Sequence, residues 1–180
     1  MTTPGQIAQY TFESLVESFF EQSQGDWRSE RRYYTLKSGE IEEVVSDITV
    51  KFLAQGSADL IQLAEMHELE DKTALVCGSQ VMWESNYTQP GRKPTVGSTV
   101  FGVRGNILFR DRGFATPKPI TAEYTMRDSK IMHLRTEYNQ SVFEEEIKLI
   151  GSSYRTRQTI ISRAGEEIMI GQYLEKRVGN

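Results

Sequence analysis

The segment QGDWRSERRYY, from Gln24 to Tyr34, joins an amphipathic stretch to a long series of alternating residues. If the segment is extended, successive side chains point to opposite faces. One face then carries Trp27, Ser29, Arg31 and Tyr33, and the other carries Arg28, Glu30, Arg32 and Tyr34. The arginines are therefore divided between two surfaces instead of forming one basic patch. We expect the first strand of a sheet from Trp27 to Leu36, with Trp27 as a buried structural residue that closes the fold.

Alternation with period two continues through most of the chain. In VVSDITVKF (44–52), apolar side chains share one face and polar side chains the other. The same pattern is found at 73–85, 95–103, 119–128, 131–138, 141–150, 153–162 and 166–177. Short turn sequences such as RDS, NQ, GSS and RAGE separate the later segments, with no helix between them. The pattern predicts an all-β fold, an antiparallel up-and-down β-barrel of about eight to ten strands.

Two segments have helical spacing instead. The stretch TFESLVESFFEQSQG (11–25) places its large apolar residues on one stripe, with Thr11 available as the N-cap and Gly25 as the C-terminal stop. A second helix is expected from Ser57 to Leu69, capped by Ser57, with His67 beside the core. We expect the N-terminal helix to plug one side of the core and the second helix to lie between early strands.

The composition restricts the class of protein. At 180 residues with 38% hydrophobic and 26% charged residues, the chain is expected to be one globular domain (1–180). Its net charge of −4 argues against general nucleic-acid binding, and no apolar run approaches membrane-spanning length. The start of the chain has no secretory-signal pattern, and Cys77 is the sole cysteine, which favours a reducing compartment. With two histidines, a Cys/His metal site is not expected.

The segment SVFEEEIKLI (141–150) is the most informative strand. Its odd positions are apolar except for Glu145. Parity therefore places Glu145 inside the barrel, whereas a register shift of one residue would place it outside. A buried carboxylate is costly unless it is protonated or paired. We adopt the inward arrangement, in which Glu145 is a candidate functional residue.

The next strand supplies possible partners for this carboxylate. Arg155 and Arg157 share one face, and two guanidinium groups so placed can clamp carboxylates or pair with Glu145. The alternative is a solvated outer face. Trp83 is either a core residue or a flat wall for an aromatic ligand. Cys77, which shares the parity of Trp83, is expected to be a buried small hydrophobe because no base lies nearby in the sequence.

Several separated blocks of the sequence resemble one family. The triplet GDW (25–27) after a helix resembles the Gly-x-Trp that opens the first strand of lipocalins, in which a late-strand arginine, here Arg163 or Arg177, packs over the tryptophan. More specific blocks resemble S-type phycobiliprotein lyases of the CpcS/CpeS/CpcU group and occur in the same order. They are FFEQSQGDWRSERRYY (19–34), EMHEL (65–69), ALVCGSQVMWES (74–85), GSTVFGV (97–103), LFRDRGFATPKPITAEYTM (108–126), LRTEY (134–138), EEEIKL (144–149) and YRTRQT (154–159).

The resemblance implies a calycin-like barrel that binds an open-chain tetrapyrrole, phycocyanobilin or phycoerythrobilin. It implies transfer of this bilin to a cysteine of an apo-phycobiliprotein α or β subunit of the phycobilisome, with formation of a thioether. Matching family positions are Glu145, Arg155 and Trp83. Family members often carry a second tryptophan further on, where this sequence reads NYTQPG with Tyr87. This departure bears on which bilin fits and on whether the protein acts alone, as a homodimer, or as a heterodimer with a paralogue. The implied location is the cyanobacterial cytoplasm or the plastid stroma.

The chemistry of a bilin fits the residues selected by parity. Its two propionates would be held by Arg155 and Arg157, with help from Arg112 at the barrel mouth. Glu145 would face the pyrrole nitrogens, and desolvation would let it share a proton with the chromophore. The bilin is then a transferred substrate, no prosthetic group or metal is expected, and the nucleophile belongs to the client protein. The alternatives are a non-catalytic carrier of the lipocalin or fatty-acid-binding type and a partner subunit of a heterodimeric lyase.

Overall fold

A computed structural model describes the backbone of residues 1–179 and the side chains of residues 1–6 and 11–179. Over these residues the chain forms two helices and ten strands. The helices are α1 (Pro4–Ser23) and α2 (Ala58–Met66). The strands are β1 (Gly25–Thr35), β2 (Glu40–Ala54), β3 (Cys77–Tyr87), β4 (Thr95–Arg104), β5 (Ile107–Arg110), β6 (Ile120–Asp128), β7 (Ile131–Tyr138), β8 (Ser141–Ile150), β9 (Tyr154–Arg163) and β10 (Glu166–Val178).

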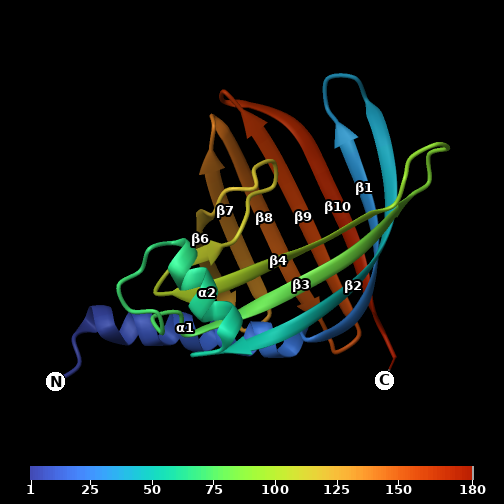
Figure 1. Cartoon of the computed structure of the whole chain (residues 1–180). Coiled ribbons are helices and arrows are strands. Elements are labelled where there is room, and N and C mark those ends of the chain that lie inside the picture. The colour runs from blue at the N-terminus through green and yellow to red at the C-terminus, as the bar shows by residue number, and fades with distance from the viewer. Residues whose placement is uncertain (180) are drawn as a thin grey trace.

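The ten strands form a closed antiparallel barrel (Figure 1). Each strand pairs with its neighbours in sequence, and β1 pairs with β10 to close the ring. The predicted up-and-down barrel is therefore confirmed. Asn139 and Gln140 form the β7–β8 turn with positive φ values of 50° and 62°, and Ala164, at φ 50°, lies in the β9–β10 turn. Strand β5 was not among the predicted strands, because four residues are too few to show alternation.

The N-terminal helix begins earlier than the sequence predicted. Thr3, not Thr11, is the N-cap: its side chain accepts a hydrogen bond from the Gln6 N–H, and the Gln6 side chain accepts from the Thr3 N–H. This capping box, followed by Pro4 in the first turn, stabilises a helix start upstream of the predicted one. The helix ends at Ser23, and Gly25, at φ 132°, leads the chain into β1.

Helix α1 lies across one end of the barrel (Figure 1). Val16, Phe19 and Phe20 are buried there, in one cluster with apolar side chains from the strands. Because these helix residues fill the end of the barrel, they form the floor of whatever space remains above them. The prediction that this helix plugs the core is confirmed.

Helix α2 packs on the outside of the barrel, against β4 and β2 (Figure 1). Its Leu60 and Leu63 approach the strands closely at two glycines: a Cβ atom at Gly78 would collide with Leu60, and one at Gly102 would lie 3.1 Å from both leucines. Ser57 is the N-cap residue, as predicted, although its side chain forms no capping hydrogen bond. In the described chain, neither helix has the length and apolar character needed to cross a membrane.

Candidate functional site

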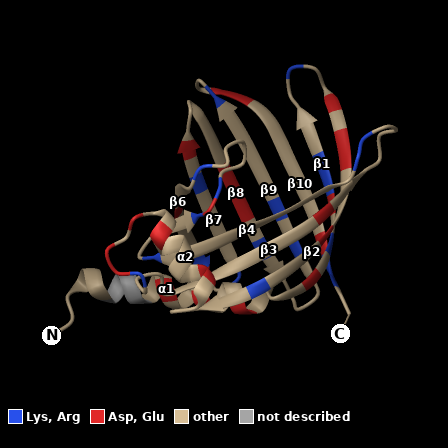
Figure 2. Ribbon diagram, viewed as in Figure 1, with Lys and Arg blue, Asp and Glu red and all other residues tan. Residues whose placement is uncertain are grey.

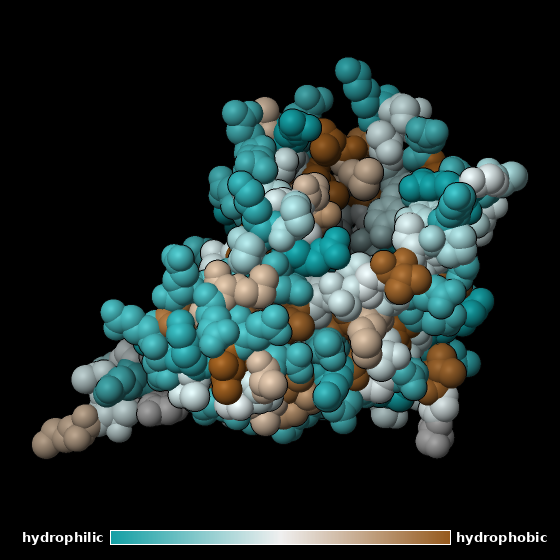
Figure 3. Space-filling model, viewed as in Figure 1, coloured by the Kyte–Doolittle hydropathy of each residue, from teal (hydrophilic) through white to brown (hydrophobic). Residues whose placement is uncertain are grey.

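A cavity of about 230 Å³ lies inside the barrel, above the floor formed by Phe19 and Phe20. Figure 3 shows a recess in the upper part of the molecule with hydrophobic side chains visible inside it. The residues selected from the sequence all line this cavity: Glu145, Arg155, Arg157, Trp83 and Arg112. The fold therefore brings together side chains from β3, β8 and β9 and from the segment after β5.

Glu145 points into the barrel, as parity predicted, and its residue exposure is 5%. Its carboxylate accepts a hydrogen bond from Arg157 at 3.1 Å. Arg157 lies opposite Ile147 in the β8–β9 register, so the pair is formed diagonally across two residues of the ladder. Burial alone would lower the pKa of Arg157, but the charges of Glu145 and Glu175 outweigh this effect and raise the pKa above its ordinary value. Arg157 therefore stays charged, and its close contact with Glu145 compensates for the burial of both side chains.

Arg155 has a different carboxylate partner, Glu175 of β10. The two residues lie directly opposite each other, and Arg155 Nε donates to Glu175 Oε1 at 3.0 Å. Glu175 is 0% exposed. Burial would raise the pKa of Glu175, but the charges of Arg155 and Arg157 lower it below its ordinary value. The ion pair is formed through Nε of Arg155, and Arg155 also lines the cavity.

Trp27 lies below the cavity, at the end of the barrel that α1 closes. Its indole N–H donates to the Ser23 carbonyl at 2.9 Å, and the side chain is almost fully buried. The guanidinium carbons of Arg155 and Arg177 lie 4.9 and 4.2 Å from the ring centroids of Trp27. Of the two arginines considered from the sequence, Arg177 is the one that packs over this tryptophan. It also donates to the carbonyls of Gln22, Gln24 and Ser152, which ties the end of α1 to the barrel.

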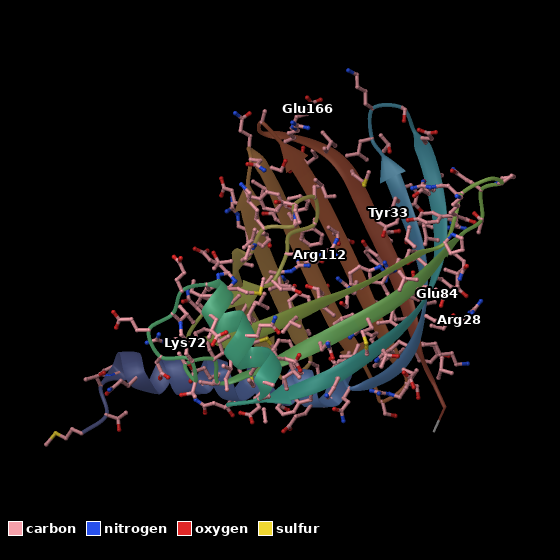
Figure 4. All side chains as sticks on the ribbon, in the orientation of Figure 1. Arg28, Tyr33, Lys72, Glu84, Arg112 and Glu166 are labelled. Atoms are coloured by element: carbon pink, nitrogen blue, oxygen red, sulfur yellow. The ribbon has the colours of Figure 1, made fainter. Side chains whose placement is uncertain are left out.

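Trp83 and Arg112 form part of the cavity wall. Trp83 lies across Gly97 on the neighbouring strand, where a Cβ atom would collide with the indole ring. The guanidinium carbon of Arg112 is 5.9 Å from the centroid of Trp83. Asp111, one residue earlier, accepts hydrogen bonds from Thr99 Oγ1 at 2.7 Å and Val100 N–H at 3.1 Å, which fixes the start of this segment. Figure 4 shows Arg112 and Tyr33 directed into the barrel.

Four further residues of the site were not assigned from the sequence. Arg31, Arg110, Tyr33 and Tyr173 all line the cavity. Tyr173 lies between two cations, with its ring centroid 5.3 Å from Arg31 and 5.2 Å from Arg157, and its ring meets Tyr33 edge to face at 5.7 Å. Parity on β1 put Arg31 and Tyr33 on the same face as the buried Trp27, and that signal could have identified them. Arg110 and Tyr173 become recognisable only once the strands are paired.

The cavity has an excess of positive charge. Five arginines, at positions 31, 110, 112, 155 and 157, line it together with one carboxylate, Glu145. Even when the adjacent Glu175 is included, three positive charges are not balanced by acidic side chains of this group. Figure 2 shows basic positions along the β1 and β9 walls of the barrel. Such a cavity is suited to an anionic ligand with an apolar, aromatic body.

Cys77 and His133 lie away from this arrangement. Cys77 is 0% exposed, and burial together with Glu17, Glu13 and Glu21 raises the pKa of its thiol, so it remains protonated at neutral pH. His133 lies on the outer surface beside Glu146, with 3.4 Å between Nε2 and Oε2. Neither side chain lines the cavity. The expectation that Cys77 is a buried small hydrophobe agrees with its position.

Comparison with known proteins gives a consistent set of matches. The family model described as CpeS-like protein matches residues 15–178. A candidate phycocyanobilin lyase of the CpcS type from Nostoc sp. strain PCC 7120 is 58% identical over 166 residues, which are 92% of this chain and 92% of that protein. A candidate chromophore lyase, CpcV, from Picosynechococcus sp. strain PCC 7002 is 49% identical over 93% of this chain and 84% of its own length.

A solved structure supports the fold independently. The S-type phycobiliprotein lyase CPES from Guillardia theta superimposes with a TM-score of 0.78, and the match covers 99% of each chain. The two sequences are 24% identical, so this likeness is evidence for the calycin-like barrel.

Proposed function

This chain belongs to the CpeS-like family, and from this premise we propose that it is a bilin lyase. It binds an open-chain tetrapyrrole, phycocyanobilin or phycoerythrobilin, within residues 1–180 acting as one domain. It then attaches the bilin through a thioether to a cysteine of an apo-phycobiliprotein α or β subunit. The reaction forms a carbon–sulfur bond, and the bilin is a transferred substrate instead of a resident cofactor.

The excess positive charge of a cavity with aromatic walls is the observation that supports this proposal best. A bilin is a flat conjugated molecule with two propionates, so it requires both properties. Arg155, Arg157 and Arg112 hold the propionates, and Trp83 provides a flat surface for the conjugated rings. The cavity volume of about 230 Å³ is below the range of roughly 300–1,000 Å³ that is usual for a ligand site, so part of the bilin extends through the mouth.

Glu145 controls the proton of the bound bilin. In the empty cavity its carboxylate is paired with Arg157, and a propionate that engages Arg157 frees Glu145 to accept a hydrogen bond from the pyrrole nitrogens. A carboxylate at this place stabilises the protonated chromophore. Protonation makes the ethylidene carbon of the bilin more electrophilic toward the client thiolate.

The reaction is a net addition. The client sulfur forms a bond to the ethylidene carbon, the carbon–carbon double bond is consumed, and one proton is delivered to the tetrapyrrole, so no group leaves. The nucleophile comes from the client, in keeping with the buried, protonated Cys77. The lyase contributes positioning and proton control. The site of action is the cyanobacterial cytoplasm or the plastid stroma, and the active form is a monomer, a homodimer or a heterodimer with a paralogue.

The first test is binding and transfer by the purified protein. Addition of phycocyanobilin should change its visible absorption, and co-expression with bilin synthesis enzymes and candidate client subunits should give covalent product that fluoresces with zinc on a denaturing gel. If phycocyanobilin gives no spectral change while a fluorescent fatty acid binds and is displaced, the protein is a carrier and the lyase proposal fails.

The second test separates the roles of the site residues. Glu145→Gln should alter the spectrum of the bound bilin and slow transfer, with a smaller effect on stability. The matched control is Glu144→Gln, because Glu144 is the adjacent carboxylate on the exposed face of β8. Identical spectra and transfer rates for the two variants would exclude proton control by Glu145. Arg155→Ala should weaken bilin binding, and unchanged affinity would show that Arg155 does not hold a propionate.

A further inference from the structure

Arg110, the last residue of β5, differs from the other buried arginines of the cavity. Its exposure is 8%, and it lines the same space as Glu145. Arg155 and Arg157 each form an ion pair, with Glu175 and Glu145. In the described part of the chain, the guanidinium of Arg110 forms neither a hydrogen bond nor an ion pair, and its buried Nε has no partner. A buried cation without a hydrogen-bond acceptor is costly, so a compensating group is expected from outside the chain.

The surroundings of Arg110 hold it in place without neutralising it. Its guanidinium carbon lies 4.9 Å from the ring centroid of Phe101 and 4.6 Å from that of Phe114. Its backbone carbonyl accepts a hydrogen bond from His67 Nε2 at 2.8 Å, which anchors the end of β5 to α2. Two aromatic contacts and a fixed backbone therefore orient the guanidinium before any ligand arrives.

Arg110 lies close enough to the Glu145–Arg157 pair to be influenced by it. Burial is the main effect that lowers the pKa of Arg110; the charge of Glu145 opposes this and that of Arg157 adds to it. Phe114 also stacks on Phe143, at 4.6 Å between ring centroids, and Phe143 is two residues from Glu145 on β8. Arg110 on β5 and Arg157 on β9 thus present guanidinium groups to one cavity from separate strands.

We propose that Arg110 binds a carboxylate of the ligand inside the cavity, which for a bilin is one of the two propionates. The identity of the ligand rests on the proposed function, whereas the site itself rests on the unpartnered guanidinium. A propionate at Arg110 receives a charge-assisted hydrogen bond in a desolvated setting. With the second propionate at another arginine, the two contacts define the orientation of the chromophore relative to Glu145.

The test compares ligands that differ only in charge. Wild type and Arg110→Met are titrated with phycocyanobilin and with its dimethyl ester, followed by visible absorption. Arg110→Met should weaken binding of the free acid by about 10- to 100-fold and of the ester by less than about threefold. The matched control is Arg32→Met, because Arg32 lies on the outer face of β1 and pairs with Glu43 there. If Arg110→Met loses the same affinity for the acid as for the ester, or loses no affinity for either, the proposal is overturned.

Thermal unfolding distinguishes binding from a structural role. Removal of a buried, unpaired charge should leave the melting temperature of Arg110→Met unchanged or higher. A lower melting temperature together with equal losses for acid and ester assigns Arg110 to packing and overturns the proposal. Arg110→Lys keeps the charge without the planar donor fork, and it should retain a preference for the acid over the ester. Loss of that preference in the lysine variant argues against charge recognition and counts against the site.

A fatty acid separates this inference from the lyase proposal. Suppose that wild type does not bind phycocyanobilin but binds a fluorescent fatty acid. The methyl ester of that fatty acid should then bind wild type more weakly than the free acid does, and Arg110→Met should abolish this difference in affinity. That result supports the carboxylate site and contradicts the bilin assignment. If wild type binds phycocyanobilin and Arg110→Met does not discriminate acid from ester, the lyase proposal stands and the carboxylate site is wrong. If wild type binds neither phycocyanobilin nor the fatty acid, the lyase proposal and the carboxylate site are both wrong.

Discussion

The two halves of the barrel interior share the same strands but differ in the side chains that line them, apolar at the α1 end and rich in arginine around the cavity. At the α1 end, Trp27 is enclosed by apolar neighbours, and its indole N–H is hydrogen-bonded. Four residues further along β1, Arg31 faces a cavity in which Arg110 Nε and Arg157 Nε are buried without partners. One half of each strand therefore stabilises the fold, while the other half is prepared for a ligand. Substitutions in the two halves should separate stability from binding.

Trp27→Ala should give the largest loss of stability. It removes a fully buried indole together with the surface on which Arg155 and Arg177 pack, so we expect a loss of about 3–5 kcal/mol in the free energy of unfolding. Denaturant unfolding followed by far-ultraviolet circular dichroism measures it. A loss below about 1 kcal/mol would contradict the assignment of Trp27 to the stabilising half.

Glu175→Gln tests the boundary between the two halves. The variant leaves Arg155 without its carboxylate in a buried setting, and the expected loss is about 3 kcal/mol. Because the pKa of Glu175 is lowered in the folded state, its stabilisation is present above the unfolded value of about 4.3 and is lost as the pH falls through the folded value. Unfolding free energies measured between pH 7 and pH 3 should therefore fall less steeply in the variant. Parallel curves would show that the pKa of Glu175 is the same in the folded and unfolded states.

The boundary between these halves was only partly predictable from the sequence. Inward orientation of Glu145 and Arg157 followed from alternation, because side-chain parity is a property of the extended backbone. The pairing of Arg155 with Glu175, in contrast, depends on the β9–β10 register, which joins residues 20 positions apart. Arg110 was missed for a related reason: its strand has four residues, too few to establish a face.

The ends of the helices show a similar limit. Thr11 and Thr3 both fit an N-cap by residue type, and the sequence alone favoured the one next to the apolar stripe. Local hydrogen bonding places the N-cap at Thr3, because Gln6 completes a capping box there and Pro4 fits the first turn of the helix. Position of the helix was therefore predictable from its apolar residues, whereas its start depended on side chains outside the stripe.

Trp83→Ala is the counterpart of Trp27→Ala in the ligand-binding half. Trp83 is partly exposed and lies across Gly97, so we expect a stability loss of about 1 kcal/mol or less and a loss of about tenfold in bilin affinity. Absorption titration and thermal unfolding of the same sample give both values. Gly97→Ala, which displaces the indole without removing it, should weaken binding similarly. A large loss of stability with unchanged affinity would assign Trp83 to the core.

Cys77→Ala should have the smallest effect. The thiol is fully buried in the stabilising half, so the expected cost is about 1 kcal/mol, with bilin affinity and transfer unchanged. In the wild-type protein a thiol reagent should label Cys77 only after unfolding, even at pH 9, since burial and nearby glutamates raise its pKa. Rapid labelling of the native protein would show that this end of the barrel opens readily.

Helix α1 closes one end of the barrel and leaves the other end open, and this constrains the order in which ligand and client can bind. A ligand that enters by the mouth has to leave by the same route, because Val16, Phe19 and Phe20 fill the other end. If the client of the proposed reaction docks over this mouth, it blocks the entry of free bilin, so the bilin has to bind before the client docks. Excess client should therefore slow turnover when it is added before the bilin and not when it is added after.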